Sequence, residues 1–282
     1  MAYKIVNQFG FSQRRVGVKE FNADLSDKSC VLFVLNEDGY QAYRANDYVG
    51  AELKFSEMIS MTHGSYSIPH YNLGLVYLDK GAKEILAIGK TEYYTKAVAE
   101  FKQANSLRPD FPPYLRGLGT ACYRNQDNQC ADENYQRAIQ IDPNDGLAYL
   151  GLAELHRFNK AYQQAQANID QVVKILKNYN KGDRDVLESR LDEQLGILAF
   201  EYQRWNVAVD YLTKAMTLDL DHLEVLAYYR ASSYGNSGDI QKACKDLKKY
   251  LNPNLTPSQY LAGETDRRKN AEALKHSLGC AN

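Results

Sequence analysis

One pattern of small and large residues recurs along this chain of 282 residues and limits what it can fold into. An alanine is followed four residues later by a bulky residue, and three residues after that by a small or branched one. The members are Ala97, Phe101 and Ala104; Ala131, Tyr135 and Ala138; Ala165, Ile169 and Val172; Ala208, Leu212 and Ala215. Residues with this spacing share one face of a helix, so the pattern predicts a helix that presents the same face in every copy.

A second signal precedes each of these helices. A large residue is followed directly by a small one, at Leu73-Gly74, Leu118-Gly119, Leu152-Ala153 and Leu195-Gly196. A polar turn then leads to the alanine, and Pro109 or Pro143 follows the end of two of the second helices. Small residues at facing positions let two backbones approach closely, and a proline cannot continue a helix. Each copy is therefore predicted to be an antiparallel helix pair.

This pattern strongly resembles the tetratricopeptide repeat, whose helix pairs recur about every 34 residues. The resemblance implies an all-α fold, a right-handed superhelical solenoid of about six helix-turn-helix repeats. Two of the six fit more weakly, one around Gly39 and Phe55 and one around Ala243 and Leu247. The expected repeats lie near residues 32–65, 67–111, 112–145, 146–188, 189–222 and 224–253.

Both ends of the chain depart from the repeat. Residues 254–282 are expected to form a capping helix, with Leu261, Ala271, Leu274 and Leu278 covering the last apolar face. Residues 1–31 are expected to form an arm that packs on the first repeat. An alternative is a functional basic arm built around Arg14 and Arg15.

Two insertions interrupt the period. Residues 82–92 are predicted to lengthen a helix or to project toward a partner. The stretch around residues 178–188 is predicted to extend the following helix, with Asp183 as its N-cap.

The sequence offers no constellation for catalysis. The five histidines are scattered, and no phosphate-binding loop, GxGxxG or GxSxG motif is present. The formal net charge of −1 gives phosphate-driven nucleic-acid binding no electrostatic basis. No apolar run approaches the roughly 20 residues that span a bilayer. We therefore expect a non-catalytic protein without cofactor or metal, which neither binds nucleic acid nor spans a membrane.

In proteins with this repeat, the first helices line a concave groove that binds peptides, so the resemblance implies a groove here. Mapping the family's groove positions selects Tyr40, Tyr43, Tyr71, Leu75, Arg116, Thr120, Tyr123, Leu150, Glu154, Arg157, Arg190, Ile197 and Tyr228. Tyrosines give contact area at low entropic cost and arginines fix register. The alternative is that these tyrosines pack between repeats, since the chain holds 22 of them.

One subclass of the family grips the acidic C-terminal tails of chaperones with a clamp of Lys, Asn and Arg. Asn72 matches that clamp in type. The other positions are occupied by Asn36 and Tyr40 in the first repeat and by Pro113 and Gly117 in the third. These departures argue against chaperone-tail binding.

Cys122 and Cys130 lie on either side of a polar turn, within reach of a disulfide if the two helices face each other. The alternative is two unlinked thiols, because the chain has an odd count of five cysteines. No signal peptide is recognisable at the N-terminus as given, which slightly favours the cytoplasm. A removed signal peptide would make the chain periplasmic or secreted.

The leading functional hypothesis is a protein-interaction scaffold that binds an extended or helical segment of a partner, within a larger assembly. Two alternatives remain open from sequence. One is a cell-envelope or secretion assembly factor with oxidised cysteines, and the other is a regulatory fragment of an enzyme whose active domain lies elsewhere.

Overall fold

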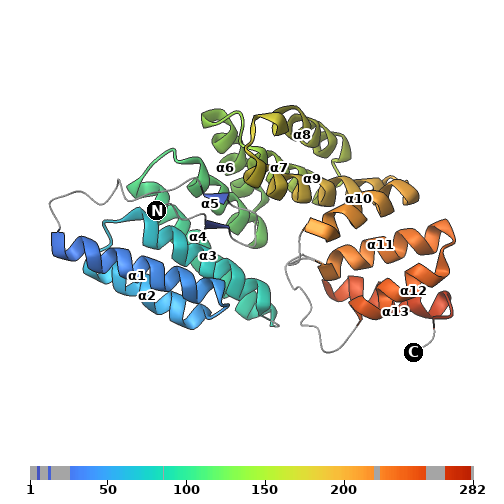
Figure 1. The fold of residues 1–282 in the computed structure, drawn as a ribbon, viewed down its shortest axis with the longest axis horizontal. Coiled ribbons are helices and arrows are strands. Elements are labelled where there is room, and N and C mark those ends of the chain that lie inside the picture. The colour runs from blue at the N-terminus through green and yellow to red at the C-terminus, as the bar shows by residue number, and fades with distance from the viewer. Residues whose placement is uncertain are drawn as a thin grey trace. The chain divides into compact units, whose positions relative to one another are not determined.

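The structure is a computed structural model that describes residues 5–6, 12–13, 26–84, 86–218, 223–251 and 264–280. The chain divides into two compact units, residues 1–148 and 149–282, which are described separately. The first unit holds β1 (Ile5–Val6), β2 (Ser12–Gln13), α1 (Ser26–Arg44), α2 (Tyr48–Met61), α3 (Ser67–Lys83), α4 (Ala87–Leu107), α5 (Pro112–Arg124) and α6 (Asn128–Ile141) (Figure 1).

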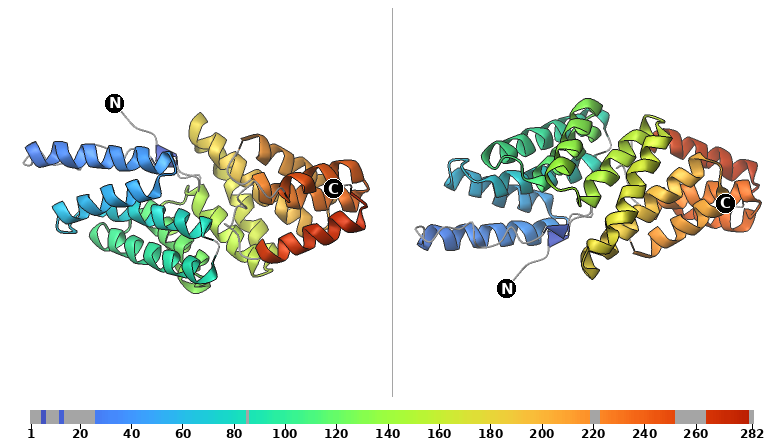
Figure 2. Two further views of the ribbon diagram at one scale, coloured as in Figure 1. Left: turned by 90° about the horizontal axis from the view of Figure 1, so that it is seen from below. Right: turned by 90° about the horizontal axis from the view of Figure 1, so that it is seen from above.

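The boundary between the units falls within α7 (Gly146–Phe158). The second unit continues with α8 (Tyr162–Ile175), a short 3₁₀ turn η2 (Leu176–Asn178), α9 (Lys181–Glu201), α10 (Trp205–Leu218), α11 (Leu223–Ser237), α12 (Ile240–Tyr250) and α13 (Glu264–Ser277). Successive helices pair along the chain in both units (Figure 2). Apart from the two-residue strands β1 and β2, every regular element in the described residues is helical, which confirms the all-α prediction.

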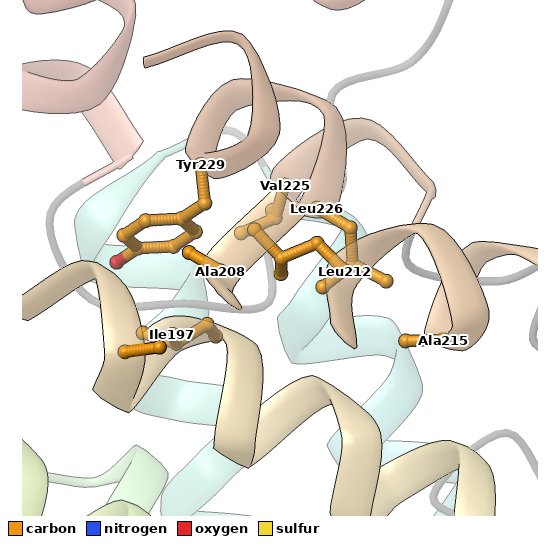
Figure 3. Close-up of a cluster of buried hydrophobic side chains, with 8 residues drawn as sticks. Ile197, Ala208, Leu212, Ala215, Val225, Leu226 and Tyr229 are labelled. Carbon is orange, nitrogen blue, oxygen red and sulfur yellow. The ribbon is translucent and has the colours of Figure 1, made fainter. Parts of the chain in front are cut away.

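The anchor positions of the second helices form the core. All of the predicted residues are buried: Ala51, Phe55 and Met58; Ala97, Phe101 and Ala104; Ala131, Tyr135 and Ala138; Ala165, Ile169 and Val172; Ala208, Leu212 and Ala215; Ala243, Leu247 and Tyr250. In the second unit, Leu212 and Ala208 meet Ile197 of α9 and Val225 of α11 (Figure 3). Burying one aliphatic side chain contributes about 1.5–3 kcal/mol, so these repeated contacts are the main source of stability.

The small residues of the first helices lie directly against the bulky anchors. A Cβ on Gly74 would lie 2.9 Å from Cε1 of Phe101, and one on Gly196 would lie 2.7 Å from Cγ of Leu212. Only a residue without a side chain permits so close an approach of the two helices. The large–small signal is therefore explained by helix–helix packing within each pair.

Short turns join the two helices of a pair, and two local features stabilise them. The residue before the capping position has a positive φ, as at Asn46 (61°) and Gln126 (64°). The next residue caps the second helix, and the carboxylates of Asp47, Asp127 and Asp239 each accept a hydrogen bond from the third amide that follows. Asparagine and glutamine tolerate the left-handed conformation better than branched residues do, and aspartate is a preferred N-cap.

The structure corrects two boundaries. Residues 26–31, which the sequence placed in the arm, form the start of α1. The cap of α9 is Asn180, whose side chain accepts from the amide of Asp183, so Asp183 lies in the first turn. Leu261 lies outside the described residues. Of residues 1–25, the structure describes only β1 and β2, which pair antiparallel, so the predicted packing of the arm on the first repeat also lies outside the described residues.

The insertion at residues 82–92 lengthens both helices of its pair, because α3 continues to Lys83 and α4 begins at Ala87. Just before the insertion, α3 is held to α2 by polar contacts: Lys80 and Tyr77 both donate to the carboxylate of Glu52. The tip of the insertion is apolar and open, with Leu86 65% and Ile88 82% exposed. The insertion is thus a helix extension that ends in two exposed aliphatic side chains.

Candidate binding surfaces on the first helices

The structure separates the predicted groove residues into two groups. Tyr71 and Ile197 are 1% and 0% exposed and belong to the core. The ring of Tyr71 lies between Phe101 and Tyr114, with centroids 5.5 and 5.0 Å away. A partner could reach neither side chain without opening the fold, so we remove both from the candidate surface.

The other predicted groove residues of the first unit are also buried, each with no more than 9% of its surface exposed. They are Tyr40, Tyr43, Leu75, Arg116, Thr120 and Tyr123. Thr120 and Tyr135 share a hydrogen bond of 3.0 Å that links α5 to α6. Burial and the nearby carboxylate of Asp79 raise the pKa of Tyr43 well above its ordinary value. The Tyr43 phenol therefore stays protonated at every physiological pH.

Arg116 has a structural role. Its guanidinium forms an ion pair with Asp145, which is itself buried. The same Asp145 accepts a hydrogen bond of 3.0 Å from the amide of Ala148 at the start of α7. Arg116 thus joins α5 to the turn before α7. Its buried charge is compensated within the protein by the carboxylate of Asp145.

Two arginines missed by the sequence reasoning lie over predicted tyrosines. The guanidinium of Arg44 is 5.9 Å from the ring centroid of Tyr40, and that of Arg124 is 5.3 Å from the centroid of Tyr123. Arg44 is exposed and Arg124 is half-buried, so both present charge to solvent at the ends of α1 and α5. Both arginines lie in the last turn of a first helix, and this position is the sequence signal that could have identified them. We call Tyr40, Arg44, Tyr123 and Arg124 the Tyr–Arg surface.

In the second unit, Leu150 is buried, whereas Glu154, Arg157, Arg190 and Tyr228 are half-buried. Arg190 donates to Glu193 at 2.9 Å, and Nε of Arg157 donates to Gln194 at 3.4 Å. The Tyr228 ring packs on Tyr229 and Tyr250, and burial raises the pKa of its phenol. These residues combine a partly accessible tyrosine with arginines that are already oriented by neighbours.

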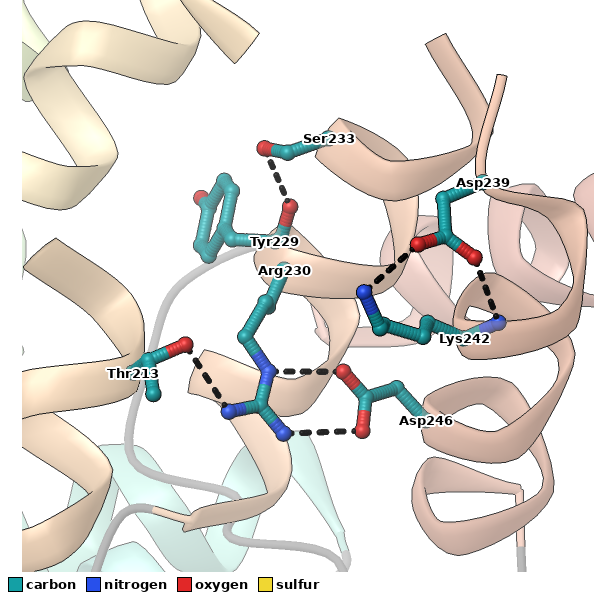
Figure 4. A network of polar contacts seen from close by, with 7 residues as sticks. All are labelled: Thr213, Tyr229, Arg230, Ser233, Asp239, Lys242 and Asp246. Carbon is teal, nitrogen blue, oxygen red and sulfur yellow. Dashed lines mark hydrogen bonds and ion pairs between the residues drawn. The ribbon is translucent and has the colours of Figure 1, made fainter. Parts of the chain in front are cut away.

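A polar hollow of about 720 Å³ lies between α10, α11 and α12 of the second unit. Asp210 and Lys214 line it from α10, and Tyr234, Asp239 and Lys242 line it from the α11–α12 turn. Beside it, Arg230 makes a bidentate contact with Asp246 at 2.7 and 2.9 Å and donates to Thr213 at 3.1 Å (Figure 4). The paired charges are mutually satisfied, and this network joins three helices.

Cys122 and Cys130 are paired in the structure, with Cα atoms 5.7 Å apart. That separation lies within the roughly 4.4–6.8 Å that a disulfide requires. Asp127 completes the one group in the described residues with three donor atoms close enough for a metal. Its carboxylate is engaged as the cap of α6, accepting from the amide of Cys130 at 3.0 Å. The geometry therefore favours a bond between the two sulfurs over shared ligation of a metal.

No protein-family model and no curated protein sequence matches this chain. Solved structures do match in fold. The Cut9–Hcn1 hetero-tetramer of the APC/C superposes with a TM-score of 0.67 at 16% identity, over 88% of this chain and 44% of that one. Yeast Tom70 gives 0.56 at 17% identity, over 87% of this chain and 47% of that one. This chain thus spans less than half the length of either.

A tetratricopeptide repeat protein from Parabacteroides merdae matches along nearly its whole length. Its TM-score is 0.53 at 15% identity, over 88% of this chain and 96% of that one. The fold of this chain is therefore that of the tetratricopeptide repeat proteins, as the anchor pattern predicted. Among the residues that the structure describes, no helix has the length and apolar character needed to cross a bilayer.

Proposed function

We propose that this chain is a non-catalytic scaffold for protein–protein interaction, which holds an extended or helical partner segment along its first helices. The repeat fold supports a role in binding proteins. The observation that carries the finer proposal is the Tyr–Arg surface, where Arg44 lies over Tyr40 and Arg124 lies over Tyr123. The tyrosines are largely buried and support the two arginines, which reach solvent, and a guanidinium held over an aromatic ring can bind a carboxylate or a backbone carbonyl of a partner.

The chemistry of the surface favours a polypeptide over other ligands. A formal net charge of −1 gives no general attraction for nucleic-acid phosphates. The clamp expected for chaperone tails is not matched at Pro113 and Gly117. Two arginines held over tyrosine rings fit a partner segment that presents carboxylates or backbone carbonyls.

Two arginine substitutions test the proposal. Partners captured from the source cell are first identified, and their affinities for Arg44→Ala and Arg124→Ala are then measured. We expect each variant to bind about 5- to 30-fold more weakly, corresponding to about 1–2 kcal/mol. Arg137→Ala is the matched control, since Arg137 is an exposed arginine on the second helix α6 that pairs with Asp110. Equal losses for Arg137→Ala and Arg124→Ala would exclude the Tyr–Arg surface as the binding site.

A second candidate is an assembly factor of the cell envelope or secretory route. The cysteine pairs of the structure favour it, because disulfides persist in oxidising compartments. This candidate shares the binding surface of the first and differs from it only in where the protein works.

A further inference from the structure

The C-terminal helix α13 is attached to the rest of the second unit by a narrow apolar contact. Ala271 is its one fully buried residue among those described, and Leu274 and Leu278 are half-buried. These side chains lie on Ala231 and Leu247, which belong to α11 and α12 (Figure 1). The rest of the helix is strongly polar, with the sequence ETDRRKNAEALKHS. So small an apolar face provides little free energy to hold a helix in place.

The surface beneath α13 needs a cover. Ala227, Ala231, Leu247 and Tyr250 are each no more than 3% exposed, and α13 contributes part of that burial. In the other repeats the equivalent face is covered by the next helix pair. A solenoid whose last repeat loses its cap exposes this apolar edge, which is an aggregation hazard. The fold therefore requires α13 to stay in place, but the apolar contacts of α13 hold it only weakly.

The chain just after α13 turns back toward α12. The amide of Cys280 donates to the carbonyl of Lys275 at 3.1 Å, and that of Gly279 donates to His276 at 3.1 Å. With Gly279 at a φ of +65°, this is a Schellman turn, for which glycine is the favoured residue. The turn brings the Cα of Cys280 to 5.4 Å from the Cα of Cys244, within the range for a disulfide.

We propose that Cys244 and Cys280 are oxidised to a disulfide that locks the C-terminal cap onto the last repeat. The inference does not depend on the proposed binding function. The bond closes a loop across a sequence separation of 36 residues, so it strongly restricts the detached states of α13. It is placed where non-covalent packing is weakest. Cys244 neighbours the core residue Ala243, so the anchor point on α12 is rigid.

Formation of this bond requires an oxidant, which we assign to the class of thiol–disulfide oxidoreductases. One cysteine thiolate attacks the disulfide of the oxidoreductase, forming a mixed disulfide and releasing one of its thiolates. The second cysteine thiolate attacks the sulfur of the first and releases the other thiolate. Two protein thiols thus lose two electrons and two protons, and one donor disulfide becomes a dithiol. Such donors operate in oxidising compartments.

The Cys122–Cys130 pair supplies an independent observation of the same kind, because it lies in the other unit and closes a different turn. Two pairs with bonding geometry are harder to attribute to chance packing of thiols than one. Both pairs fit maturation in an oxidising compartment, where such bonds persist.

The test uses the full chain, produced in an oxidising compartment and kept without reductant. Free thiols are alkylated, the protein is digested, and cross-linked peptides are mapped by mass spectrometry. Hydrogen exchange of α13 is then followed with and without reductant, in the unchanged chain, in Cys244→Ser with Cys280→Ser, and in Cys122→Ser with Cys130→Ser as the matched control.

We expect a peptide that joins Cys244 to Cys280. Reduction should accelerate exchange of α13 by about a hundredfold or more, as the chain-entropy model predicts for a loop of this size. The control should respond to reductant in the same way, and the Cys244/Cys280 double variant should exchange fast with or without it. Recovery of both residues as free thiols would overturn the proposal, and so would α13 protection that is the same with and without the bond.

Discussion

Gly119 of α5 and Tyr135 of α6 touch so closely that a Cβ on the glycine would lie 2.9 Å from Cδ1 of the tyrosine ring. The phenol of the same tyrosine shares a hydrogen bond with Thr120, the next residue of α5. The glycine therefore fixes the separation of the two helices, and the hydrogen bond fixes their register. This small–large contact recurs between Gly74 and Phe101 and between Gly196 and Leu212.

The first prediction concerns this contact. Gly119→Ala should lower the free energy of unfolding by about 1–3 kcal/mol, because the added methyl group forces the tyrosine ring to move. The loss should appear although alanine has the higher helix propensity, by about 1 kcal/mol. Gly235→Ala is the control, since a Cβ there meets the flexible ends of two leucines, Leu278 at 3.2 Å and Leu274 at 3.6 Å. Urea unfolding that finds the two variants equally stable would contradict the packing account.

The second prediction concerns Tyr71. Because its ring is enclosed by Phe101 and Tyr114, Tyr71→Ala should destabilise the fold by about 3–5 kcal/mol, as large core truncations do. Tyr202→Ala should cost far less, since Tyr202 is 41% exposed. Thermal unfolding compares the two. A Tyr71→Ala protein that keeps its full stability but loses its partner would return Tyr71 to the binding surface.

The exposed tip of the α3–α4 extension gives a third prediction. Replacing Leu86 and Ile88 by serine should change the free energy of unfolding by less than about 0.5 kcal/mol each, because neither side chain is packed. Deletion of residues 82–92 should also leave a folded chain, since the flanking residues Tyr77, Tyr94 and Ala97 remain. Circular dichroism and thermal melts check both variants. Collapse of the fold on deletion would show that the extension is part of the core.

The fourth prediction concerns the Arg230–Asp246 pair (Figure 4). Asp246→Asn should destabilise the second unit by roughly 1–3 kcal/mol, because it leaves a largely buried guanidinium without a counter-charge. The exposed pair of Glu92 with Lys96 is the control, and Glu92→Gln should have no measurable effect on unfolding. Chemical denaturation at matched ionic strength measures both. An unchanged midpoint for Asp246→Asn would show that the network contributes no stability.

The core of this fold could be read from the sequence because its physics is local and periodic. Each alanine, such as Ala131, lies one helical turn before a bulky residue, such as Tyr135, and the bulky residue packs against a small residue of the preceding helix. The same steric requirement recurs in each helix pair, so residues of the same type appear at the same spacing in every repeat and reveal the repeats. The anchors of the second helices are all buried in the structure.

Features that depend on contacts distant in sequence could not be read in this way. The burial of Tyr71 depends on the rings of Phe101 and Tyr114, which lie far from it in the sequence, and Tyr40 is buried as well. Asn180 and Asp183 are both good N-caps, so the start of α9 was ambiguous. The approach of Cys280 to Cys244 requires the turn at Gly279, which no local pattern of cysteines reveals.

The most direct test of the binding account is site-specific photo-crosslinking in the source cell. A photoreactive phenylalanine analogue is placed at Arg124 on α5, at Arg44 on α1, or at Arg137 on α6. Adducts are purified and their peptides are identified by mass spectrometry. We predict that one partner protein is cross-linked from Arg124 and from Arg44, and that Arg137 gives no adduct with it. Adducts that form only from Arg137, or from none of the three positions while the partner still co-purifies, would contradict binding along the first helices.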